Sequence, residues 1–180
     1  MDGYFQRLFV PSANMINNEH DDIVTFEKCI AFLNAIGIQT IFRSLGDDSF
    51  LPGFLIENGT IIIDRDTLKY PGDILHEAGH VAVVSTKDRA RLTENAIIKR
   101  KDREAEEIMA IAWSYAACLH LDIDPDYVFH EEGYRGGSSD IMESCRMNDY
   151  IGILMLQSVG MMTKAGDKED FPPMKKWLRA

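Results

Sequence analysis

The sequence predicts an α+β fold, in which a short antiparallel sheet is followed by helices. Alternating apolar residues with a turn signal lie between residues 54 and 64, and stretches with helical periodicity follow from residue 71 onward. Strands first and helices afterwards is the order of an α+β fold. The chain has 180 residues, 46% of them hydrophobic, which suffices for one domain with a sizeable core. We therefore expect residues 1–180 to form a single domain.

The first predicted helix follows Asp21 and Asp22. Apolar residues then recur at the spacing of one helix face: Ile23, Val24, Phe26, Ile30, Leu33 and Ile36. Gly37 stands where a glycine commonly ends a helix. The segment 38–43 alternates loosely and is expected to form a strand.

A hairpin is predicted next. The apolar segments 54–57 and 60–64 flank Asn58-Gly59, a pair that tolerates the positive φ angles of a two-residue turn. We expect the strand 60–64 to expose an edge to which an extended peptide could add.

A helix is predicted from Pro71 to Val84, with Pro71 at a first helical position and Asp73 in the first turn. It contains His76-Glu77-Ala78-Gly79-His80, an H-E-x-x-H pattern. Two histidines four residues apart project from one face of a helix, one turn above the other. Both imidazoles can therefore bind one Zn²⁺, and Glu77 then stands beside the open coordination position as a general base.

A catalytic zinc ion usually has three protein ligands, so one more is needed. No further histidine follows directly, because the chain continues as Val81-Ala82-Val83-Val84-Ser85-Thr86. The next predicted helix, 102–121, begins with acidic residues. We expect Glu107 to be the third ligand, because small residues one turn later let this helix approach the first closely. Glu106 is the nearest alternative, Glu104 also stays open, and Asp102 is a weaker choice.

The H-E-x-x-H pattern followed by a glutamate on the next helix resembles the gluzincin zinc metallopeptidases. The hairpin strand leading into Ile74-Leu75 and the motif is similar to the small ImmA/IrrE-type minigluzincin domains. The resemblance covers about residues 54–118 and implies a zincin-like domain that hydrolyses peptides. It departs in the second helix, where Glu107-Ile-Met-Ala-Ile replaces the usual Glu-x-x-Ala-Asn/Asp.

A polar, glycine-rich loop spans residues 130–139. It carries three hydrogen-bond donors that could stabilise a developing oxyanion: His130, Tyr134 and Arg135. Ordinary roles are open to each, such as a turn cap for His130 or an ion pair of Arg135 with Glu131 or Glu132. One or two helices broken near Gly152 are predicted over 140–162, and a tail starts at Pro172-Pro173.

Composition restricts the partners. The formal net charge of -10 argues against a general nucleic-acid surface. No apolar run reaches the roughly 18 residues of a membrane span, and the N-terminus lacks the pattern of a signal peptide. Cys29, Cys118 and Cys145 are odd in number and contain no C-x-x-C pair, which is typical of reduced cysteines in a cytoplasmic protein.

The sequence therefore predicts a zinc-dependent hydrolase, and among hydrolases a peptidase acting on a peptide or protein. An alternative is a metal-binding regulatory or interaction domain on the same scaffold without turnover. In a third interpretation no metal binds, and the two histidines are ordinary core residues.

Overall fold

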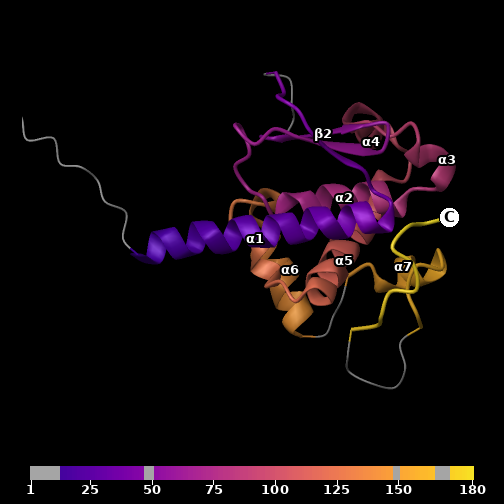
Figure 1. The fold of residues 1–180 in the computed structure, drawn as a ribbon. Coiled ribbons are helices and arrows are strands. Elements are labelled where there is room, and N and C mark those ends of the chain that lie inside the picture. The colour runs from indigo at the N-terminus through magenta and orange to yellow at the C-terminus, as the bar shows by residue number, and fades with distance from the viewer. Residues whose placement is uncertain (1–12, 47–50, 148–150, 165–170) are drawn as a thin grey trace, which may run out of the picture.

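The structure is a computed structural model that describes residues 13–46, 51–147, 151–164 and 171–180, with side chains from Asp21 onward except that of Arg135 (Figure 1). Its elements follow in the order α1 (Ala13–Ile36), β1 (Thr40–Phe42), β2 (Phe54–Glu57), β3 (Thr60–Ile63), α2 (Asp73–Val83), α3 (Thr86–Arg89), α4 (Glu94–Lys99), α5 (Arg103–Leu121), the 3₁₀ turns η1 (Pro125–Tyr127) and η2 (Tyr134–Gly136), α6 (Ser138–Arg146) and α7 (Ile153–Ser158).

The small sheet has the strand order β1-β3-β2. The prediction of an antiparallel sheet is wrong in part, because β1 runs parallel to β3 while β2 is antiparallel to it. The strand β3 takes the centre because it is the most apolar of the three, with Ile61, Ile62 and Ile63 all buried. The α+β class is confirmed, and the sheet within it is mixed.

The expected free edge on the strand 60–64 is also wrong. β1 pairs with one edge of β3 and β2 pairs with the other, from Thr60 to Ile63. A peptide therefore has no edge of β3 to which it can add.

The hairpin turn has the predicted conformation, with positive φ angles of 51° at Asn58 and 75° at Gly59. The helix end at Gly37 is likewise confirmed, with a φ angle of 95°. Two short helices, α3 and α4, were not predicted, because four and six residues are too few to show helical periodicity. Side chains cap the N-termini of both helices: Ser85 accepts from the Asp88 amide and Thr93 from the Ala96 amide.

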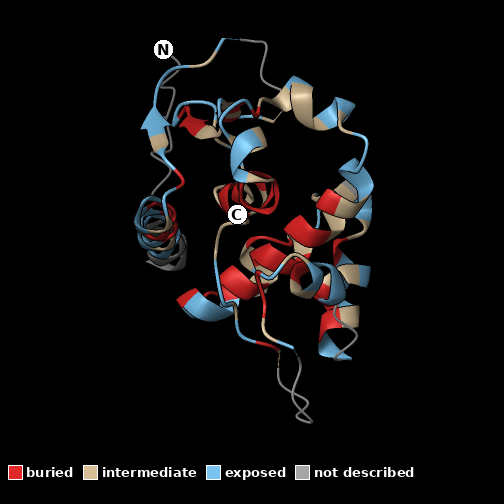
Figure 2. Ribbon diagram, turned by 90° about the vertical axis from the view of Figure 1, so that its right-hand side faces the viewer, coloured by how far each residue is buried: buried red, intermediate tan, exposed pale blue. Residues whose placement is uncertain are grey.

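The helix α2 lies between the sheet and α5 (Figure 1). Buried residues concentrate on helices at the centre of the molecule (Figure 2), and α2 is buried along most of its length. At Gly79 the two helix backbones come so close that an added Cβ would lie 2.9 Å from the Ala110 carbonyl oxygen. The Ser114 hydroxyl of α5 also donates to the Leu75 carbonyl of α2 at 3.2 Å. Close packing thus fixes α5 against the predicted metal-binding helix.

The C-terminal end of α2 is held by two segments distant in sequence. The Arg89 guanidinium donates to the carbonyls of Val81, Ala82 and Val84, which have no partners within the helix. The Arg179 amide donates to the Ala82 carbonyl at 3.0 Å. These bonds satisfy the last carbonyls of α2 and anchor the C-terminal tail to it.

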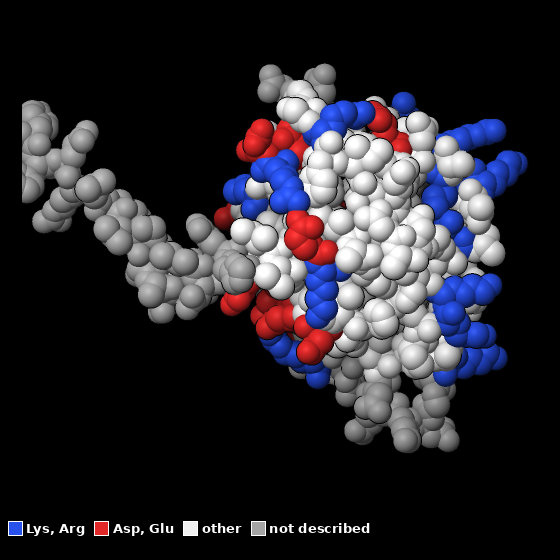
Figure 3. Space-filling view, in the orientation of Figure 1, with Lys and Arg blue, Asp and Glu red and all other residues white. Residues whose placement is uncertain are grey.

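The charged side chains are unevenly distributed on the surface. On the face in Figure 3, basic side chains gather along the right-hand edge, over α3 and the C-terminal segment. Among the described residues, no helix is long and apolar enough to cross a membrane. The three cysteines are free and buried, as predicted for reduced thiols.

Substitution of Gly79 by alanine is expected to lower the free energy of unfolding by about 1–3 kcal/mol, because the new methyl group must push the α5 backbone away. Chemical denaturation measures this change. Gly46→Ala is the matched control, since an added Cβ there meets nothing within 4 Å. A Gly79→Ala protein as stable as the wild type would show that the helices do not need this close approach.

Candidate metal centre

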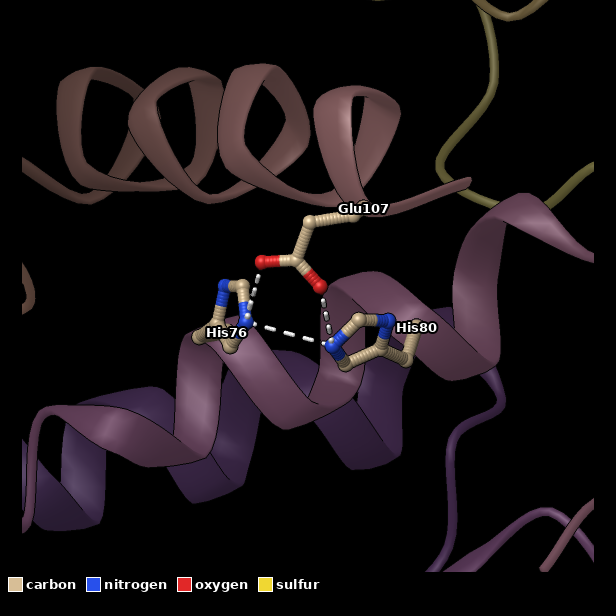
Figure 4. A group of neighbouring side chains, drawn as sticks. All are labelled: His76, His80 and Glu107. Carbon is tan, nitrogen blue, oxygen red and sulfur yellow. Dashed lines mark hydrogen bonds and ion pairs between the residues drawn. The ribbon is translucent and has the colours of Figure 1, made fainter. Parts of the chain in front are cut away.

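Three side chains from two helices converge in the space between α2 and α5 (Figure 4). The Nε2 atoms of His76 and His80 lie 3.1 Å apart. The Glu107 carboxylate faces both rings, with Oε1 3.4 Å from His76 Nε2 and Oε2 3.4 Å from His80 Nε2. In the part of the chain that the structure describes, this is the one group of three such side chains able to hold a metal ion.

The placement of Glu107 follows from the helix packing. Glu107, Ala110 and Ser114 are spaced three and four residues apart, so they share one face of α5. Ala110 contacts Gly79, and Ser114 donates to the Leu75 carbonyl. The same stripe that packs α5 onto α2 therefore carries Glu107 to the two histidines.

The other acidic candidates lie elsewhere. Glu106 is buried and pairs with Arg100, whose Nε and Nη2 lie 2.6 Å and 2.8 Å from its two carboxylate oxygens. Arg100 also reaches Asp88 at 3.1 Å. Glu104 and Asp102 are exposed. The geometry thus brings Glu107, and none of its acidic neighbours, to the histidine pair.

The two histidines of the cluster differ in protonation. Burial lowers the pKa of His80 to about 3, and the neighbouring His76 adds to this, so the His80 imidazole is neutral. Burial also acts to lower the pKa of His76, but a hydrogen bond to Glu107 and nearby carboxylates outweigh it and raise that pKa. The side chains of His76 and His80 are only 14% and 11% exposed, whereas that of Glu107 is 45% exposed. Solvent therefore reaches the cluster from the Glu107 side.

Glu77 is buried within α2, between the two histidines in sequence. Burial raises the pKa of its carboxyl to about 7, the charge of His76 opposes this, and the Asp73 carboxylate adds to it. A carboxylate whose pKa lies near neutrality is well suited to accept a proton and return it.

Tyr134 lies beside the cluster. Its ring centroid is 5.0 Å from that of His76, and the two planes are nearly perpendicular at 78°. Its buried hydroxyl has no hydrogen-bond partner among the described residues, and burial raises its pKa well above the usual value. The backbone is in the left-handed region, with a φ angle of 52°. An unpaired buried hydroxyl lowers the free energy of unfolding by about 1–3 kcal/mol, so the Tyr134 side chain destabilises the folded protein.

His130 lies outside the cluster formed by His76, His80 and Glu107. Its Nε2 is 3.0 Å from Asp73 Oδ1, and its ring stacks on Tyr70 with centroids 4.0 Å apart. No described contact joins it to the three clustered side chains, and its Nδ1 is buried without a partner. The structure therefore places His130 against the first turn of α2. The side chain of Arg135 lies outside the described residues.

Two residues near the cluster, Asp73 and Tyr70, were not predicted to belong to the site. Asp73 precedes His76 by three positions and so shares its helix face, a spacing that could have found it. Tyr70 gave no signal, because its stacking on His130 depends on how a distant loop folds back.

Comparison with known proteins identified no relative of the chain: no family model matches, nor does any curated protein or solved structure. The interpretation of the site thus depends on its own geometry and chemistry.

Replacement of Glu106 by glutamine is expected to lower the free energy of unfolding by about 1–3 kcal/mol, because the Arg100 guanidinium loses its buried charged partner. Denaturant titration of the purified variant measures the loss. Glu57→Gln, which removes a carboxylate from the exposed pair with Arg43, is the control and is expected to leave the midpoint nearly unchanged. An equal effect of both variants would contradict a structural role for Glu106.

Proposed function

We propose that the protein is a zinc-dependent hydrolase and, more specifically, a peptidase. The observation that supports it most is the convergence of His76, His80 and Glu107 on one point between two helices. Two imidazoles and one carboxylate form a donor set typical of catalytic zinc, with a fourth position left for water. The resemblance of the motif to gluzincins adds the expectation of a peptide substrate.

The ion supplies two things when bound: it lowers the pKa of a coordinated water toward about 7 and polarises a carbonyl group. Glu77 is the general base, because it is fixed on the same helix as both histidines and burial brings its pKa to about 7. It takes the proton of the attacking water and delivers it to the leaving amine. Burial favours the neutral acid in the free protein, and a cation beside the carboxyl favours its ionised form.

Tyr134 is the second electrophile in this proposal. Its hydroxyl stays protonated and has no competing partner among the described residues, so it is free to donate to an oxyanion. The edge contact with the His76 ring keeps it next to a metal ligand. His130 is a positioning residue, since its contact with Asp73 fixes the loop that carries Tyr134 against the start of α2.

Elemental analysis of untagged protein is expected to find near-stoichiometric zinc, which His76→Ala and Glu107→Gln each abolish or strongly reduce. The reason is that a site with two protein ligands holds the ion much less tightly than a site with three. Glu106→Gln is the matched control and keeps its zinc, because that side chain pairs with Arg100. Zinc-free wild-type protein that folds normally would contradict the proposal, as would zinc lost equally from both glutamate variants.

Glu77→Gln is expected to keep its zinc and to lower kcat for peptide cleavage by about 10²–10⁴-fold, because the amide cannot accept the proton. Tyr134→Phe also keeps zinc and loses roughly 10²-fold, because one oxyanion donor is removed. A fluorogenic peptide library assayed with each variant measures both effects. Zinc-loaded wild type that cleaves nothing would favour the alternative, a metal-binding domain without turnover.

A further inference from the structure

An open cleft of about 650 Å³ lies between the segment 126–131 and one face of α6. Its floor is apolar, formed by the buried side chains of Phe129 and Met142. Its rim is charged, with Asp126 and Glu131 contributed by the segment and Arg146 by the helix. An apolar floor under a charged rim suits a peptide, whose side chains include both kinds of group.

The wall of the cleft contacts the region of the proposed centre. His130 lines the cleft and binds Asp73 in the first turn of α2. Phe129 lines it too, and its ring centroid is 5.2 Å from that of Tyr134, which in turn contacts His76. A ligand in the cleft would therefore lie next to the loop that carries Tyr134.

The charges of the rim are available to a ligand. Asp126, Glu131 and Arg146 are all exposed, and none of them forms an ion pair with another described residue. Opposite charges left unpaired on one cleft favour a ligand that carries both signs.

Glu131 and Arg146 lie at different ends of α6. The Ser138 hydroxyl, at the start of the helix, donates to the His130 carbonyl at 2.7 Å, which places the neighbouring Glu131 near that end. Arg146 is the last residue of the helix, about 12 Å further on at 1.5 Å of rise per residue. An extended chain of roughly three to four residues spans this distance.

We propose that this cleft binds a segment of a peptide substrate that carries a basic side chain facing the acidic segment 126–131 and an acidic group at Arg146. The proposal rests on the peptidase function proposed above and names its substrate class. The cleft includes neither the three candidate metal ligands nor Glu77. Binding is therefore testable separately from zinc and from catalysis.

The test titrates acetyl-Lys-Ala-Ala-Glu-amide onto isotope-labelled, full-length Glu77→Gln protein, with and without zinc, and follows backbone amide resonances by NMR. The amides of 126–131 and 138–146 are expected to shift in both states. Asp126→Asn/Glu131→Gln and Arg146→Gln are each expected to raise Kd about fivefold, the effect of losing one or two exposed ion pairs. Asp140→Asn/Glu143→Gln, which removes two exposed carboxylates of α6 outside the cleft lining, is the matched control and leaves Kd unchanged.

Three results would overturn the proposal: no shift of the cleft amides in either state, equal weakening of binding in the control, or a Kd that is unchanged in Arg146→Gln.

Spermidine is titrated in parallel, because it offers the same cationic chemistry without an acidic group. If spermidine binds as tightly as the peptide and depends only on Asp126 and Glu131, the cleft is a site for a free polyamine. Peptide binding in the cleft of a protein that holds no zinc would confirm the peptide site and overturn the peptidase proposal, so the two failures are distinguishable.

Discussion

The close approach of α2 and α5 at Gly79 and Ala110 is the constraint on which the candidate centre depends. The H-E-x-x-H spacing alone aligns two imidazoles on one helix face, but it cannot supply a third ligand. Glu107 reaches both rings at 3.4 Å because the stripe of α5 that it shares with Ala110 and Ser114 lies directly on α2. A larger residue at position 79 would separate the two helices and so move Glu107 away from both histidines.

The region around this packing interface is built at some cost in stability. Glu77 is a buried carboxyl, and Tyr134 combines a positive φ angle with an unpaired buried hydroxyl. A core selected for stability alone would place apolar side chains at such positions. Glu106 shows the contrast, since its buried carboxylate is fully matched by the half-buried Arg100. Unmatched polar groups beside a possible metal site are the pattern expected where a protein retains groups for chemistry.

Much of this arrangement was predictable from sequence, because local patterns determine it. The Asn58-Gly59 turn, the end of α1 at Gly37 and the helix around His76 and His80 all follow from backbone preferences and periodicity. The central position of β3 was not predictable. β1 and β3 are distant in sequence, and their pairing depends on the burial of apolar side chains in the folded protein. The sequence was also insufficient to decide whether Glu106 or Glu107 faces the histidines. A shift of one residue rotates a helical side chain by 100°, and only the partner helix and Arg100 decide which glutamate faces the histidines.

X-ray absorption spectroscopy at the zinc edge identifies the ligands of the ion in the intact protein. A zinc centre formed by His76, His80 and Glu107 is expected to give a first shell of nitrogen and oxygen atoms at about 2.0–2.2 Å, with the outer-shell scattering of two imidazoles and no sulfur. A shell that contains sulfur at about 2.3 Å, or one without imidazole, would contradict a zinc centre formed by His76, His80 and Glu107.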